Sequence, residues 1–194
     1  EMLKAVARGL QERGAPIGPE TRDLAMDITG KLLESGNPNQ IQMGLELAGT
    51  IKIDGMRAPL ARFAADRNAP RQQRTAAVNA LAALDPVGSI PDLAGILGDA
   101  SSPIELREQA ANVLNGTGQV KAREAMVNAL PTAPGRLQTS IAIALATTLP
   151  GGEMLLQAVK EGKASARLLQ ERAVEVRLSL QNVPELKERL AVLL

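Results

Sequence analysis

The sequence contains no cysteine, histidine, tyrosine or tryptophan, and Phe63 is its only aromatic residue. Without cysteine the chain forms no disulfide and offers no thiolate, and without histidine it lacks the commonest general base and nitrogen ligand. The missing tyrosine and tryptophan also remove the usual platforms on which nucleic acid bases stack. Carboxylates, hydroxyls, lysine and arginine are the residue types left for chemistry. We therefore expect no cofactor in this segment, and no thiol-dependent or imidazole-dependent catalysis.

The sequence also lacks a long apolar run. The nearest is "SIAIALATTL", which is much shorter than the roughly 20 residues that a membrane-spanning helix requires. We expect no membrane insertion. The chain begins at Glu1, without an initiator methionine or a signal pattern, so we expect it to be part of a larger protein. The absence of cysteine leaves the compartment undecided, because disulfide-free proteins occur on both sides of a membrane.

The chain also has no large excess of positive or negative charge. Lysine and arginine number 22 and aspartate and glutamate 21, which gives a formal net charge of +1. A surface that tracks phosphates needs a basic stripe, and no predicted repeat is strongly basic. We expect no nucleic acid partner.

The chain does contain a repeat. "APRQQRTAAVNALAA" and "SPIELREQAANVLNG" match thirty-three positions apart. The apolar residues of the chain are mostly alanine and leucine, with apolar positions at helical spacing, which favours helices over strands. The shared positions are Pro70 and Pro103, Arg74 and Arg107, Ala77 and Ala110, Asn79 and Asn112, and Leu81 and Leu114.

Proline-containing helix starts recur along the chain. In "NPNQ", "SPIE" and "NVPE" we predict N-caps at Asn37, Ser102 and Asn182, each followed by a glutamine or glutamate that completes a capping box. Each repeat then comprises two helices. A single hairpin of short helices cannot bury its apolar face, so consecutive hairpins stack. The fold class predicted is all-α: a right-handed α-α superhelix, or solenoid, of about five to six helical hairpins.

We predict one solenoid domain over residues 1–194. A helical pair occupies residues 1–37, four clearer repeats occupy residues 38–167, and a second helical pair occupies residues 168–194. The four repeats run over residues 38–70, 71–103, 104–134 and 135–167.

"RTAAVNALAALDPVGSIPDLAGIL" resembles the HEAT repeat of the short, phycobilisome-lyase-like type, in which an Arg-x-x-Ala-x-x-x-Leu helix precedes a turn and a second helix. The last full repeat departs from this motif, with Gln138, Ile141 and Leu145 at the Arg, Ala and Leu positions. The C-terminal segment "LLQERAVEVRLSLQNVPELKERLAVLL" is also similar to the helical-repeat region of large bacterial proteins of the PVC type that end in a c-type haem domain. That resemblance implies a neighbouring haem module and an exported protein.

Three acidic residues, Glu20, Asp23 and Asp27, fall on one face of a helix that follows Pro19. Paired carboxylates can bind a hard cation or transfer protons. Acids in the first turns of a helix also complement its dipole and face solvent, and we favour this second interpretation.

Arg67, Arg71 and Arg74 cluster at a repeat junction, where an anion is one possible ligand. We favour a structural role for Arg74 and its equivalent Arg107, each paired with an acid or a carbonyl group of the neighbouring hairpin.

We also expect structural roles for the other repeated positions. Asn79 and Asn112 are expected to form hydrogen bonds between hairpins, and Leu81 and Leu114 are expected to be buried. These assignments favour a non-catalytic scaffold that binds another protein or a neighbouring domain of the same chain and is monomeric in isolation. The alternative is a lyase-like or hydrolase-like solenoid enzyme that uses the acidic face at Asp23 and Asp27.

Overall fold

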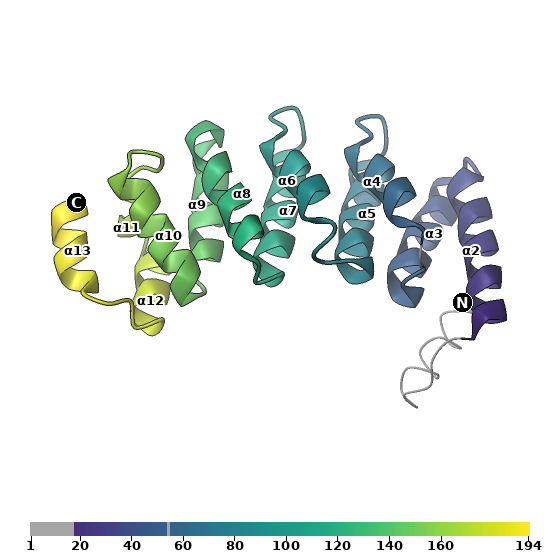
Figure 1. Ribbon diagram of the computed structural model, residues 1–194. Coiled ribbons are helices and arrows are strands. Elements are labelled where there is room, and N and C mark those ends of the chain that lie inside the picture. The colour runs from purple at the N-terminus through teal and green to yellow at the C-terminus, as the bar shows by residue number, and fades with distance from the viewer. Residues whose placement is uncertain (1–17, 54) are drawn as a thin grey trace. The chain divides into compact units, whose positions relative to one another are not determined.

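The structure is a computed structural model that describes residues 18–53 and 55–194 (Figure 1). These residues form twelve α-helices and one short 3-10 helix, and they contain no strand. The all-α prediction is confirmed. The right-handed superhelix stays a prediction.

The chain divides into two compact units, the first extending to Ser89 and the second beginning at Ile90. This boundary separates the two helices of the predicted repeat 71–103. The first unit contains α2 (Pro19–Glu34), α3 (Pro38–Ile51), α4 (Arg57–Ala65) and α5 (Arg71–Leu84). The second contains α6 (Ile90–Gly98), α7 (Ile104–Gly116), α8 (Val120–Ala129), η1 (Leu130–Thr132), α9 (Gly135–Leu145), α10 (Leu149–Lys160), α11 (Arg167–Gln170), α12 (Arg172–Leu180) and α13 (Leu186–Leu193).

In the first unit, α3 is the central helix: it packs against both α2 and α5, and α4 packs against α5. Gly49 allows α3 and α5 to approach closely, since a Cβ atom at this position would lie 2.9 Å from the Cα atom of Ala80. A larger residue would push the two helices apart.

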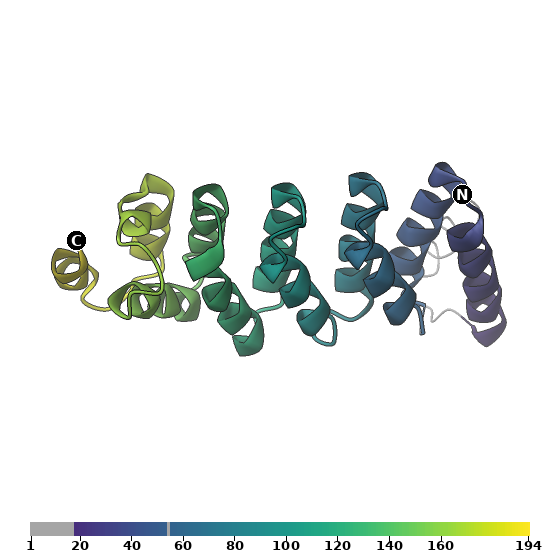
Figure 2. The ribbon, with the colours of Figure 1, turned by 90° about the horizontal axis from the view of Figure 1, so that it is seen from above.

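The second unit is built from two rows of helices. The first helices of successive hairpins contact one another, α7 with α9 and α9 with α12, and the second helices do the same, α6 with α8 and α8 with α10 (Figures 1 and 2). Each helix therefore buries one face between the rows and leaves another face outside.

One predicted helix start is confirmed. Asn37 is the N-cap of α3, with Pro38 as the first helical residue, and its Oδ1 atom accepts hydrogen bonds from the backbone N–H groups of Asn39 (3.0 Å) and Gln40 (3.4 Å). In the other half of the predicted capping box, the backbone N–H of Asn37 was expected to donate to the side chain of Gln40. It donates instead to Oγ of Ser35 at 3.2 Å.

The cap predicted at Ser102 is wrong. Helix α7 begins at Ile104, one residue later than expected, and Pro103 takes the N-cap position with an extended backbone. The hydroxyl of Ser102 instead donates to Oδ2 of Asp99 at 2.9 Å. Ser102 thus belongs to the turn before α7, where its hydroxyl bonds to the carboxylate of Asp99 and not to the backbone of the helix.

The cap predicted at Asn182 is also wrong. Helix α13 begins at Leu186, after Glu185 in the left-handed region (φ 51°), and Asn182 also has a positive φ of 52°. A residue that caps a helix start has an extended backbone, so Asn182 cannot serve as the cap in this conformation. The segment that precedes α13 is a turn containing Pro184.

The two repeated arginines have the same geometry. Arg74 and Arg107 are each 3% exposed, and each donates from Nε to the backbone carbonyl group ten residues earlier: Ala64 at 2.9 Å and Leu97 at 2.8 Å. Both acceptors lie in the second helix of the preceding hairpin. The arginines therefore link consecutive hairpins through a carbonyl group, which is the structural role that we favoured.

Gln138 occupies the arginine position in α9, and it makes a similar link. Its Nε2 atom donates to the carbonyl oxygen of Leu130 at 3.0 Å, eight residues earlier. The shorter side chain thus reaches a carbonyl group that lies nearer in the sequence. Ile141 and Leu145, at the alanine and leucine positions, are both fully buried. The departure from the motif therefore preserves the packing.

The apolar positions of the repeat form the core of each unit. Leu81 in the first unit and Leu114 in the second are both 0% exposed, at equivalent places in their helices. Both are buried, as expected from the repeat.

Candidate functional site

The acidic residues Glu20, Asp23 and Asp27 lie exposed on α2. Asp27 forms an ion pair with Lys31 one turn later, at 2.6 Å. Among residues 18–53 and 55–194, no group of three or more acidic side chains is arranged to hold a metal ion. The acidic face therefore consists of solvated side chains, one of which is paired along the helix.

The three arginines at the repeat junction differ in burial. Arg67 and Arg71 are exposed, whereas Arg74 is buried and bonded to the carbonyl group of Ala64. Arg67 and Arg71 each have an interaction of their own. The structure thus separates Arg74 from the two surface arginines with which the sequence grouped it.

The repeated asparagines were expected to form hydrogen bonds between hairpins, and for Asn112 this prediction is wrong. Asn79 and Asn112 are exposed, and Asn112 forms no hydrogen bond between hairpins within the described residues. The bond predicted for Asn112 is instead made by Asn115, whose Nδ2 atom donates to Oγ1 of Thr147 at 3.0 Å. Asn115 lies nearly one turn further along α7, where its side chain turns toward the next hairpin.

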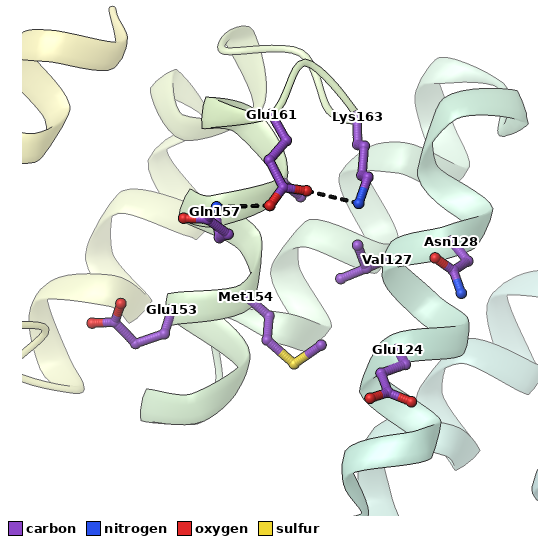
Figure 3. Close-up of a pocket in the computed structure, with 9 residues that line it drawn as sticks. Glu124, Val127, Asn128, Glu153, Met154, Gln157, Glu161 and Lys163 are labelled. Atoms are coloured by element: carbon purple, nitrogen blue, oxygen red, sulfur yellow. Dashed lines mark hydrogen bonds and ion pairs between the residues drawn. The ribbon is translucent and has the colours of Figure 1, made fainter.

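A groove lies between α8 and α10, in the row of second helices (Figure 3). Its volume is about 610 Å³. In Figure 3 the side chain of Met154 lies between the two helices. The groove is lined by acidic, amide and apolar side chains with one lysine: Glu124, Val127, Asn128, Glu153, Met154, Gln157, Ala158, Glu161 and Lys163.

Both walls of the groove are built in the same register. Gln119 is the N-cap of α8 and Thr148 is the N-cap of α10. The side chain of Thr148 accepts a hydrogen bond from the backbone N–H of Gly151, which fixes the start of α10. Counted from these caps, five buried positions coincide: Ala122 with Gly151, Met126 with Leu155, Val127 with Leu156, Ala129 with Ala158, and Leu130 with Val159.

This register gives the two helices matched polar residues. Glu124 and Glu153 are each the fifth residue after the cap, and Asn128 and Gln157 are each the ninth. Residues four apart lie on the same face of a helix. Each helix therefore presents one carboxylate and one amide on its outer face. These pairs were not predicted from the sequence, because they become visible only when residues are counted from the two helix caps.

Glu161, just after α10, is held by two hydrogen-bond donors. Its carboxylate accepts hydrogen bonds from Nζ of Lys163 at 2.7 Å and from Nε2 of Gln157 at 2.7 Å (Figure 3). These bonds, that from Lys163 most strongly, lower the pKa of Glu161 below its ordinary value. The carboxylate is ionised at neutral pH, so it acts as a hydrogen-bond acceptor rather than a proton donor.

Glu153, in α10, forms an ion pair with an arginine of α13. Arg189, in α13, donates from Nη1 to Oε1 of Glu153 at 2.8 Å, and its Nη2 atom lies 2.8 Å from Oε2. This paired geometry raises the pKa of Arg189 above its ordinary value, chiefly through the hydrogen bond. A second cavity, of about 320 Å³, lies between α10 and α13 and shares Gln157 with the groove.

Glu124 has no such partner. It is exposed, and it forms no ion pair within the described residues. In Figure 3 its carboxylate lies on the side of α8 that faces α10, whereas the carboxylate of Glu153 points away from α8. The equivalent carboxylates therefore point in the same direction along the row, and only that of Glu153 meets a cation.

No protein-family model matches the chain, and no curated protein sequence matches it either. Within the described part of the chain, no helix has both the length and the apolar character needed to cross a membrane.

Proposed function

We propose that this chain is a non-catalytic protein-interaction module, a solenoid of HEAT-like hairpins that binds a partner segment in the groove between α8 and α10. The partner is another protein or a neighbouring domain of the same chain. The observation that carries this proposal is the groove itself. It is open to solvent, it measures about 610 Å³, and its walls are two helices in the same register.

The lining of the groove suits a polypeptide. Asn128 and Gln157 carry amide groups, which can donate and accept hydrogen bonds at once, as the backbone of an extended segment requires. Met154 offers an adaptable apolar contact beside them. A surface with adaptable apolar and amide groups is typical of peptide recognition rather than of bond-breaking chemistry.

The acidic face of α2 supports the enzymatic alternative less well than the groove supports a binding module. Asp23 and Asp27 are exposed, and Asp27 is paired with Lys31 at 2.6 Å. General acid or base catalysis relies on a carboxyl group positioned in a site that excludes bulk water, and this face is exposed.

A capture experiment tests the proposal. The full chain is immobilised and exposed to extract of its source cells, in parallel with the Glu124→Lys variant. If the groove binds the partner, a protein retained by the wild type should be lost from Glu124→Lys, because the substitution replaces a negative charge by a positive one at the wall of the groove. Retained proteins are identified by mass spectrometry and quantified relative to the wild type.

The matched control is Glu175→Lys. Glu175 is exposed on α12, in the row of first helices, so this substitution makes the same charge change away from the groove. The partner should remain bound to Glu175→Lys. Equal loss from both variants, or equal retention by both, would contradict a function based on the groove.

A further inference from the structure

We infer that the groove recognises an arginine of an extended partner segment, and that Glu124 holds its guanidinium group as Glu153 holds that of Arg189. This inference rests on the proposed function and adds the chemical class of the partner. Its starting point is an interaction already present in the second unit. Glu153 engages Arg189 through both carboxylate oxygens, each at 2.8 Å from a guanidinium nitrogen.

The position of Glu124 in its helix supports the same use. Glu124 and Glu153 lie at the same distance from their helix caps, on helices that share five buried positions. Planar carboxylates and guanidinium groups match each other in a two-bond arrangement, and this match favours arginine over lysine. Glu124 therefore has the geometry of an arginine acceptor.

The neighbouring helix explains why Glu124 lacks an internal partner. Beside Glu153, α13 contributes Arg189, whereas beside Glu124, α10 contributes Met154. A thioether cannot neutralise a carboxylate, and the space between them is the groove. An arginine from outside the chain would lay its alkyl stem on Met154 and its guanidinium group on Glu124, since long basic side chains bury their stems on apolar surface.

The spacing of the helices sets the spacing of the partner's arginines. Packed helices lie about 8–10 Å apart. An extended segment in the polyproline II conformation has three residues per turn and advances about 3.1 Å per residue, so side chains three positions apart share a face and lie about 9 Å apart. Two arginines separated by three positions therefore match Glu124 and Glu153. Because Arg189 occupies Glu153, the second arginine of such a partner competes with Arg189 for that carboxylate.

Peptide titration tests this inference on the full chain. The probe is a fluorescein-labelled ten-residue peptide of glycine and serine with two arginines three positions apart, and the control peptide has glutamate in place of both arginines. Binding is followed by fluorescence anisotropy, and its location by the methyl NMR signal of Met154. The signal of Met126, which is fully buried in the core, serves as the internal reference.

Three variants give the expected pattern. Glu124→Gln should weaken binding of the arginine peptide about threefold, which is the range for an exposed ion pair. Arg189→Gln should strengthen it by a similar factor, because Glu153 is then released. Glu175→Gln, on α12, should leave the affinity unchanged. Circular dichroism melting checks that each of the three substitutions leaves the fold intact.

The outcomes separate this inference from the proposed function. If the arginine and glutamate peptides shift the Met154 signal equally, the groove binds polypeptide without selecting arginine: the inference is overturned and the proposed function stands. If neither peptide shifts the Met154 signal at millimolar concentration, the inference is overturned too. The proposed function is then judged by capture of a natural partner in the presence and absence of Glu124→Lys.

Discussion

Replacing Leu114 with alanine perturbs the repeated core at one defined place. The side chain is fully buried in α7, within the second unit. Removing three carbon atoms costs about 0.8 kcal/mol for each buried methylene equivalent, and the cavity that remains raises the total to about 3 kcal/mol. Leu81→Ala, at the equivalent position of the first unit, should cost a similar amount, within the range of about 2–5 kcal/mol seen for such changes.

Urea titration followed by circular dichroism measures this cost. With a slope of about 2 kcal/mol per molar urea, the midpoint for Leu114→Ala should fall by about 1.5 M. The control is Leu180→Ala, since Leu180 is 71% exposed at the end of α12 and should change stability by less than about 0.5 kcal/mol. If the urea midpoint of Leu114→Ala stays within a few tenths of a molar of the wild-type midpoint, the predicted register of the repeat is wrong.

Three further changes test separate parts of the structure. Arg107→Ala should lower the urea midpoint, because the carbonyl group of Leu97 loses its buried donor at a cost of about 1–3 kcal/mol; an unchanged midpoint would argue against the link between hairpins. Glu153→Gln should speed hydrogen exchange in α13 several-fold, because Arg189 loses its charged partner; unchanged exchange would show that other contacts hold the helix. Lys163→Gln should raise the pKa of Glu161 toward its ordinary value in a carboxyl NMR titration. Because the folded pKa of Glu161 is lowered, its stabilising effect is present above the unfolded pKa and is lost as the pH falls through the folded pKa; a Glu161 titration unaffected by Lys163→Gln would exclude this cause.

Much of the helical organisation follows from the sequence. The proline punctuation predicted the start of α3, and the repeat period predicted the burial of Leu81 and Leu114. Helical spacing is a strong signal because one buried face recurs along each helix.

The errors lie where turns use the same residue types as caps. Ser102 and Asn182 both precede a proline and look like N-caps, yet Ser102 donates to Asp99 and Asn182 has a left-handed backbone. The same residue types occur in N-caps and in turns, and the local backbone conformation determines which hydrogen bonds their side chains form.

The groove could not be predicted from composition, because its members are ordinary surface residues. Glu124 and Asn128 become significant only when α8 is aligned with α10 from the helix caps. Asn115 was likewise overlooked as a link between hairpins, since it lies outside the matched repeat positions. The expected neighbouring c-type haem module stays a prediction, and a C-x-x-C-H motif in the parent gene would support it.

Site-specific photocrosslinking tests the central claim most directly. A photoreactive residue is placed at Gln157, which is exposed in the groove, and in a parallel experiment at Glu175 on α12. After irradiation in source cells, we predict a discrete crosslinked protein from position 157 and none from position 175, with the crosslink mapping beside an arginine of the partner. Crosslinks from position 175 alone, or the same products from both positions, would contradict the claim that this groove is where the chain binds its partner.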